Sequence, residues 1–181
     1  MANTPTIEFS ANNIKASDFN ICFRDSYDGL VLDNYFSVFG KKNKELNKNK
    51  IKSNIYQTFL ENNFNIMGKI DNKLVGMVAG NKNGDTYEAG FILYAKINNS
   101  KDHLDDPDII IPYEKGLRDF LASNGINKVK SRVLRPCSSY TYHYETKPSR
   151  HLINILSDTV ESTREDGVEY ADIVFEFIDD I

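Results

Sequence analysis

A stretch in the middle of the chain, residues 63–134, combines two periodicities and constrains the fold more than any other part. Its first half contains three apolar runs separated by turn signals. The runs are Phe64–Ile70, Leu74–Gly80 and Thr86–Ile97, with Asp71-Asn72 and Asn83-Gly84 between them. An Asn-Gly pair is a strong hairpin signal, because a type I′ turn needs positive φ at both central residues. This half therefore predicts an antiparallel meander of three strands.

The third run, Thr86–Ile97, alternates apolar and other residues with a period of two. Such a pattern predicts a pleated strand with one apolar face. The residues predicted on that face are Tyr87, Ala89, Phe91, Leu93, Ala95 and Ile97.

The second half of the stretch changes to helical spacing and then returns to a strand. Pro112–Leu121 carries a stripe of apolar residues that recur every three or four positions, and Pro112 suits a first helical turn. Asn124-Gly125 marks the end of this helix, and Ile126–Leu134 reads as a strand. A strand that follows a crossover helix lies parallel to the strand before it. The middle of the chain thus predicts a mixed sheet.

The flanking regions predict further helices and a closing hairpin. Residues 1–13 form either a first strand or a loose arm, and Ile14–Phe23 fits either a strand or a short helical turn. The remaining elements are predicted from apolar spacing and turn signals. They are helices at Tyr27–Phe39, at Ile51–Leu60 and from Pro148 through Leu156, and a hairpin of Val160–Glu165 and Val168–Ile178 around Asp166-Gly167.

Composition excludes several functional classes. With 181 residues the chain is long enough for one domain with its own core. A net charge of −4 disfavours nucleic acid and membrane surfaces as partners, and no apolar run reaches membrane-spanning length. The two cysteines, Cys22 and Cys137, are expected to be reduced and structural. The three histidines have no metal-ligand spacing, so no metal site is predicted.

Two segments outside the predicted core carry residues of functional interest. Lys41–Lys52 is basic, but no aromatic residues interleave its lysines, so a solvated loop is favoured over a nucleic-acid contact. Tyr140, Tyr142 and Tyr144 form an aromatic stripe, either as part of the sheet or as the lining of a ligand groove or partner surface.

The predicted element order resembles that of the GNAT superfamily of acyl-CoA N-acyltransferases. The resemblance covers about residues 14–178, with Ile66–Met77 similar to the second and third strands of the family and Tyr113–Val133 similar to its central helix and fifth strand. The predicted fold class is therefore α/β, more narrowly α+β: a GNAT-like mixed, mostly antiparallel sheet flanked by helices. We expect one domain at 14–181, preceded by the arm or strand at 1–13.

The resemblance implies a site between the fourth and fifth strands, where the family binds acetyl-CoA. For an enzyme of this family, Glu88 is the implied base, and Tyr142 or Tyr144 is a fallback acid. The implied cofactor contacts are Leu93, Tyr94 and Ala95 through their backbone, and Lys115 with Gly116 for phosphate.

Three departures from the family pattern favour a different function. Residues 106–116, aligned with the glycine-rich phosphate loop of the family, hold one glycine, and Asp105, Asp106 and Asp108 repel a diphosphate. The tyrosine acid of the family aligns with Leu156. The sequence therefore favours a domain that has lost acyl-CoA chemistry and binds no cofactor. By analogy with GNAT-like domains in virus particles, it would contact other protein subunits, in a phage virion or in the cytoplasm. The alternative is an acetyl-CoA-dependent N-acetyltransferase.

Overall fold

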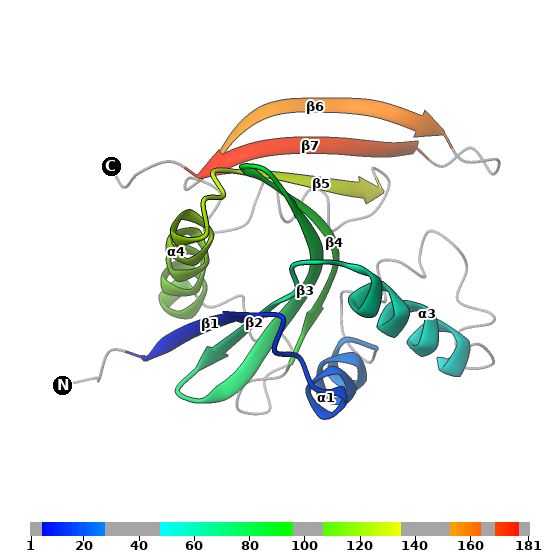
Figure 1. Cartoon of the computed structure of the whole chain (residues 1–181), viewed down its shortest axis with the longest axis vertical. Helices are drawn as coiled ribbons and strands as arrows, with labels where there is room; N and C mark the ends of the chain where they lie inside the picture. Colours follow the sequence, from blue (N-terminus) through cyan, green and yellow to red (C-terminus); the bar gives the residue numbers. More distant parts are fainter. Residues whose placement is uncertain (1–4, 28–47, 96–106, 135–152, 164–168, 178–181) are drawn as a thin grey trace.

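A computed structural model of the whole chain describes residues 5–27, 48–95, 107–134, 153–163 and 169–177. Within these residues seven strands form one sheet in the order β1-β2-β3-β4-β5-β7-β6 (Figure 1). The strands are β1 Ile7–Ala11, β2 Ile66–Ile70, β3 Lys73–Asn83, β4 Thr86–Tyr94, β5 Lys128–Leu134, β6 Ile153–Thr163 and β7 Glu169–Phe177. The helices are α1 Ala16–Tyr27, α3 Lys48–Glu61 and α4 Pro107–Ser123.

The sheet is mixed, as the sequence predicts. Neighbouring strands pair antiparallel except β4 and β5, which are parallel and are joined through α4. The meander β2-β3-β4, the crossover helix and the returning strand are thus confirmed. Residues 1–13 contribute the edge strand β1, and the segment Ile14–Phe23, which fits two predictions, lies mostly within helix α1.

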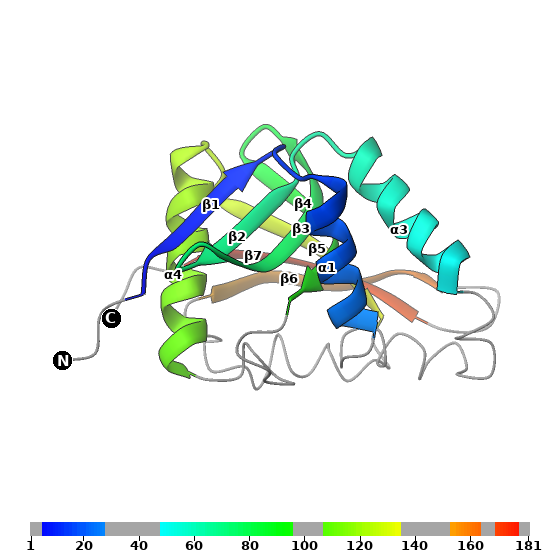
Figure 2. The ribbon, with the colours of Figure 1, turned by 90° about the horizontal axis from the view of Figure 1, so that it is seen from below.

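The helices cover opposite faces of the strongly curved sheet (Figures 1 and 2). Helices α1 and α3 lie on one face, where Phe19, Phe23 and Phe59 pack around Met77 of β3 and Leu93 of β4. Helix α4 lies on the other face and packs through two groups of apolar residues. One group comprises Leu121 with Ile66, Tyr87, Ile126 and Val129, and the second is centred on Tyr113 and Val75.

Both hairpins of the meander are present; the turn of the first is where it was predicted, and the turn of the second is not. Ile70 pairs with Lys73, and both loop residues between them, Asp71 and Asn72, have positive φ of 49° and 64°, as a type I′ turn requires. In the second hairpin Asn83 pairs with Thr86, so the loop is Gly84-Asp85, with a φ of 62° at Gly84. The predicted Asn83-Gly84 turn is therefore shifted by one residue, and Asn83 belongs to β3.

A β-bulge interrupts β4 and overturns the prediction that its apolar residues share one face. Val78 of β3 pairs with Ile92, and Gly80 pairs with Ala89, so Ala79 faces two residues of β4, Gly90 and Phe91. One extra residue shifts the alternation by one position. Tyr87 and Ala89 consequently pack beneath α4, whereas Leu93 and Ala95 pack beneath α1 and α3.

Helix α4 begins five residues earlier than predicted. Pro107 occupies its first position, where a missing N–H costs nothing, and Pro112 lies inside the helix. The predicted end is confirmed, because Gly125 has a φ of 75° and the Ile126 N–H donates to the Leu121 carbonyl.

The predicted helix from Pro148 through Leu156 is wrong at its C-terminal end, because Ile155 and Leu156 lie in strand β6. The closing hairpin is confirmed as β6 paired with β7, although the Asp166-Gly167 turn lies outside the described residues. The predicted helix at Tyr27–Phe39 lies outside them as well, except Tyr27 itself, whereas α3 confirms the helix at Ile51–Leu60.

A set of asparagines joins the end of α3 to strands β1 and β3. Asn65 is buried, and its amide donates to the Phe59 carbonyl and accepts from the Gly80 N–H at 3.3 Å. The main chain of Asn65 also bonds to Asn12, which follows β1. One side chain therefore satisfies main-chain groups of a helix end and of a central strand.

We expect Asn65→Ala to destabilise the protein by about 2–4 kcal/mol, because it leaves the Phe59 carbonyl and the Gly80 N–H without this partner. Urea denaturation followed by circular dichroism measures the change. Asn154→Ala removes an exposed 3.1 Å bond to Glu176 and should change stability by less than about 0.5 kcal/mol. Equal losses in the two variants would contradict this role for Asn65.

Candidate functional site

Strands β4 and β5 separate after a short parallel pairing. They pair only from Thr86 with Lys128 to Ala89 with Ser131. Beyond this point β4 continues to Tyr94 and β5 to Leu134, and the described residues show no further pairing between the two strands (Figure 1). We call this opening the fork and the Ala89–Ser131 pair its apex.

Beyond the apex, main-chain hydrogen-bonding groups of β4 have no partner in β5. The Ala95 N–H donates to the Val75 carbonyl, so the alternation of an antiparallel pair turns Leu93 and Ala95 toward β3. The same alternation turns the main-chain groups of Ile92 and Tyr94 toward the fork. Of the three predicted backbone contacts, Tyr94 is therefore suitably placed, whereas Leu93 and Ala95 are occupied by β3. Ile92 has the same main-chain orientation as Tyr94 and was not among the predicted contacts.

The bulge of β4 lies directly beyond the apex. Its residues, Gly90 and Phe91, follow Ala89, and a bulge leaves main-chain groups outside the regular ladder. Gly90 is exposed, and a Cβ at this position would lie 3.1 Å from the Ala79 carbonyl oxygen. The fork therefore begins at an irregular main-chain segment of β4.

Glu88, the predicted base, lies at the apex but on the opposite face from Tyr87 and Ala89. Because adjacent strand residues point to opposite faces, its side chain is on the face that carries α1 and α3. Glu88 is exposed and lies in register with Lys130 of β5. A carboxylate in this position is accessible from solvent, as a base that receives a proton from an incoming amine must be.

Tyr87 anchors the paired part of β4. Its side chain is 2% exposed, and its hydroxyl donates to the Phe64 carbonyl at 2.9 Å. Burial raises the pKa of this phenol well above its usual value. The neutral form therefore persists in the folded protein and holds β4 against the segment that precedes β2.

The predicted phosphate contacts are not where the resemblance places them. Lys115 and Gly116 lie in the middle of α4 rather than before it, and a Cβ on Gly116 would come within 3.0 Å of the Phe9 ring of β1. The residues directly before α4 are 96–106, which lie outside the described residues. The correction arises because residues 107–116, aligned with a loop of the family, are helical here.

The structure also changes the alignment between this chain and the tyrosine acid of the family. Leu156, which the sequence alignment set against the tyrosine of the family, lies in strand β6 and not in a helix after β5. The chain between β5 and β6 is residues 135–152, which contain Tyr142 and Tyr144 but lie outside the described residues. The absence of a tyrosine at position 156 therefore no longer argues against an acid.

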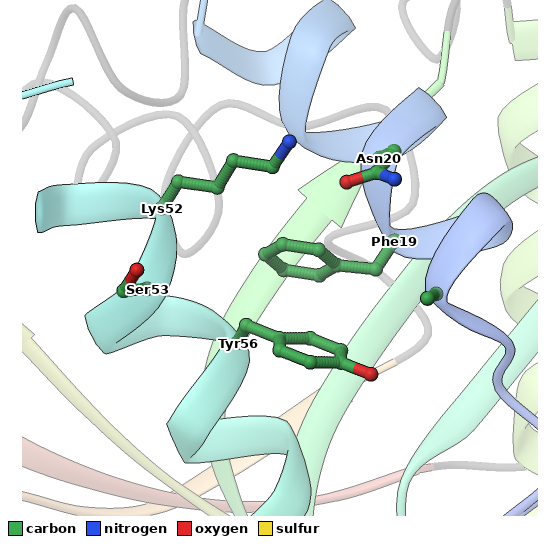
Figure 3. Close-up of a pocket in the computed structure, with 6 residues that line it drawn as sticks. Phe19, Asn20, Lys52, Ser53 and Tyr56 are labelled. Atoms are coloured by element: carbon green, nitrogen blue, oxygen red, sulfur yellow. The ribbon is translucent and has the colours of Figure 1, made fainter. Parts of the chain in front are cut away.

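A second concavity lies between α1 and α3 (Figure 3). Its volume is about 140 Å³, and it is lined by Ala16, Phe19, Asn20, Lys52, Ser53 and Tyr56. The rings of Phe19 and Tyr56 lie 4.8 Å apart, and Lys52 reaches over them toward α1. Cofactor sites occupy about 300–1,000 Å³. This hollow is too small for coenzyme A.

The part of the chain that the structure describes contains neither a metal site nor a membrane-spanning helix. No group of three or more His, Cys, Asp or Glu residues among these residues is placed to hold a metal ion. None of the described helices has the length and apolar character needed to cross a membrane.

Cys22 is a free, buried thiol, in agreement with the prediction, and burial raises its pKa, as do the nearby charges of Asp25 and Asp18.

Solved structures with a similar arrangement include several acetyltransferases. The ribosomal-protein-S18-alanine N-acetyltransferase of Escherichia coli has a TM-score of 0.54 at 12% identity, over 96% of each chain. PaiA N-acetyltransferase from Thermoplasma acidophilum, in complex with coenzyme A, has 0.52 at 11%, over 91% of this chain and 98% of that chain. A probable acetyltransferase from Staphylococcus epidermidis has 0.52 at 10%, over 94% and 99%.

No protein-family model and no curated protein matches the sequence. The similarity therefore lies in the arrangement of the chain. At these identities it establishes the fold alone: the protein has the GNAT fold, the fold of N-acetyltransferases, as the element order predicts.

We expect Tyr87→Phe to lower stability by about 1 kcal/mol at pH 7, because the bond to Phe64 is lost. The raised pKa of the folded phenol stabilises the wild type below the usual pKa of 10, and this stabilisation is lost as the pH rises, because only the unfolded tyrosine ionises. The advantage of the wild type should fall by up to about 1.4 kcal/mol per pH unit above pH 10. Urea denaturation from pH 7 to 11 measures it. The Cys22 thiol is common to both proteins and cancels, and an advantage independent of pH would contradict the argument.

Proposed function

We propose that the protein binds an acyl-CoA thioester in the fork between β4 and β5 and transfers the acyl group to an amine. The observation that carries this proposal is the fork itself. Pairing between two parallel strands stops after four residues, beside a bulge, and this leaves the main-chain groups of Ile92 and Tyr94 facing an opening. The similarity to acetyltransferases, one of them in complex with coenzyme A, supports the same function.

The described residues fit the pantetheine part of such a cofactor. Pantetheine is an extended chain with two amides, and the free edge of β4 offers an N–H and a C=O at Ile92 and again at Tyr94. The fit is independent of charge, because both sides contribute amide groups.

The described residues are less suited to binding the diphosphate of the cofactor. Asp108 lies in the first turn of α4, where a negative charge would oppose a phosphate at the helix N-terminus. The sequence contains no glycine from residue 91 to residue 115, so a glycine-rich phosphate loop is absent. The proposal therefore rests on the main-chain groups at the fork and not on contacts to the diphosphate.

In the proposed reaction the bound thioester supplies an activated acyl carbon. The residues of this chain position it and move protons. The main chain of the bulge donates hydrogen bonds to the carbonyl oxygen as negative charge develops there. Glu88, on the exposed face of β4, removes the proton of the attacking ammonium group. Tyr142 or Tyr144 supplies the proton to the departing thiolate in this proposal.

The second candidate function is an interaction or structural protein that keeps the fold without its chemistry, for instance as a subunit of a phage virion. The acidic first turn of α4 and the missing glycines favour this alternative. Such a protein would recognise other protein subunits, in the cytoplasm or in a virion, and would leave the fork without an acyl donor.

Isothermal titration with acetyl-CoA separates the two candidates. We expect binding with a Kd of about 10 μM, near −7 kcal/mol, because the fork supplies main-chain contacts although the first turn of α4 is acidic. Titration with ATP controls for binding of the nucleotide portion alone. No heat with acetyl-CoA, together with co-purification in a larger particle, would favour the interaction protein and refute the acyltransferase.

A Glu88→Gln variant tests the proposed base. Release of free thiol from acetyl-CoA in the presence of a panel of primary amines should fall by about 10²-fold or more, while acetyl-CoA affinity stays within about twofold. Glu8→Gln changes an exposed carboxylate on β1 and serves as the matched control. Unchanged turnover in Glu88→Gln would exclude Glu88 as the base.

A further inference from the structure

Ser131 is a buried polar residue at the apex of the fork. Its side chain and main chain together are 7% exposed. It pairs with Ala89, and these are the last paired residues before β4 and β5 separate. Among the residues that the structure describes, no hydrogen bond reaches the Ser131 hydroxyl, although buried hydroxyl groups are normally bonded.

The neighbours of Ser131 account for its burial but not for its polar side chain. Val129, two residues earlier on the same face of β5, is buried in the apolar group beneath α4, and Ala89 opposite packs against that group. An alanine or valine would suit such surroundings better, because an unbonded hydroxyl loses its contact with water and gains nothing in return. A polar group in this position calls for a hydrogen-bond partner, and the residues that the structure describes supply none.

We propose that the Ser131 hydroxyl donates a hydrogen bond to the acyl carbonyl oxygen of the donor in the fork. This inference rests on the proposed function. The apex is the point at which the two strands diverge, and the bulge residues, Gly90 and Phe91, follow its β4 member directly. A thioester whose carbonyl meets the main-chain donors of the bulge therefore lies next to Ser131 as well.

In this proposal the two faces of the sheet at the apex have different roles. Glu88 and Lys130 lie on the face that carries α1 and α3, whereas Ala89 and Ser131 lie on the face beneath α4. The hydroxyl holds the carbonyl oxygen from one side, and the carboxylate receives the proton of the amine on the other. Ser131 thereby orients the carbonyl and distinguishes an acylated donor from free coenzyme A.

The Ser131→Ala variant tests this inference through a difference between two ligands. We expect acetyl-CoA to bind about fivefold more weakly, the effect of one lost hydrogen bond, while free CoA binds as to the wild type. The melting temperature without ligand should stay the same or rise, since an unbonded hydroxyl is removed from an apolar site. Isothermal titration and thermal unfolding measure both quantities.

Two further variants make the result specific. Ser131→Cys keeps the volume of the side chain but replaces the hydroxyl with a weak donor, so it should resemble Ser131→Ala in acetyl-CoA affinity. In the control Ser123→Ala, the lost bond is that from Ser123 Oγ to the Phe120 carbonyl at the end of α4, at 2.7 Å. This control should leave both affinities unchanged.

The remaining outcomes overturn the inference in distinguishable ways. Unchanged affinity of Ser131→Ala for acetyl-CoA refutes the contact and leaves the proposed function intact. A lower melting temperature with equal loss of affinity for CoA and acetyl-CoA shows a structural role for the hydroxyl and also refutes it. If the wild type binds neither ligand, the proposed function and this inference fail together.

Discussion

The bulge in β4 is the constraint on which the rest of the structure depends. By placing two residues of β4 opposite Ala79, it reverses the direction of every side chain that follows. Leu93 and Ala95 can therefore complete the core beneath α1 and α3, while Tyr87 and Ala89 complete the one beneath α4. A bulge also increases the local twist of a strand. Because β5 is held by β7 along its whole length, extra twist in β4 favours the separation from β5.

The parts of the fold that the sequence predicts are those determined by local chemistry. Asp71, Asn72 and Gly84 adopt positive φ, a backbone conformation that Gly, Asn and Asp tolerate better than other residues. These residue types therefore indicate both hairpins in the sequence. Gly125 likewise marks the end of α4. The parallel pairing of β4 and β5 then follows from the crossover helix between them. Each of these signals lies within a few residues of the feature it predicts.

The failures concern features set by distant parts of the chain. The bulge was not predicted, because the alternation from Tyr87 to Ala95 reads as an uninterrupted strand, although Gly90, an isolated glycine within it, is a residue typical of bulges. The apolar residues Leu152, Ile155 and Leu156 have helical spacing in the sequence, yet Ile155 and Leu156 lie in β6, where Leu156 is an extra residue opposite β7. Two prolines suited a helix start, and the choice of Pro112 over Pro107 displaced the expected phosphate site to Lys115 and Gly116.

The candidate site was also predictable only where local sequence signals determine it. Glu88 and Tyr94 follow from the strand assignment and the family resemblance, and both lie at the fork. Ser131 gives no signal, because one serine in a strand between two basic residues is typical of an exposed surface. Only the register of β5 against β4 and β7 turns it toward α4 and buries it.

Residues outside the fork also determine its shape. Gly80 pairs with Ala89 on the other side of β4, and any Cβ at position 80 would overlap the ring and hydroxyl of Tyr87. Tyr87 needs that space to reach the Phe64 carbonyl, and this bond fixes β4 just before the apex. A side chain at Gly80 would therefore move Tyr87, and with it the position at which β4 leaves β5. The geometry available to a ligand in the fork thus depends on a glycine that no ligand in the fork need touch.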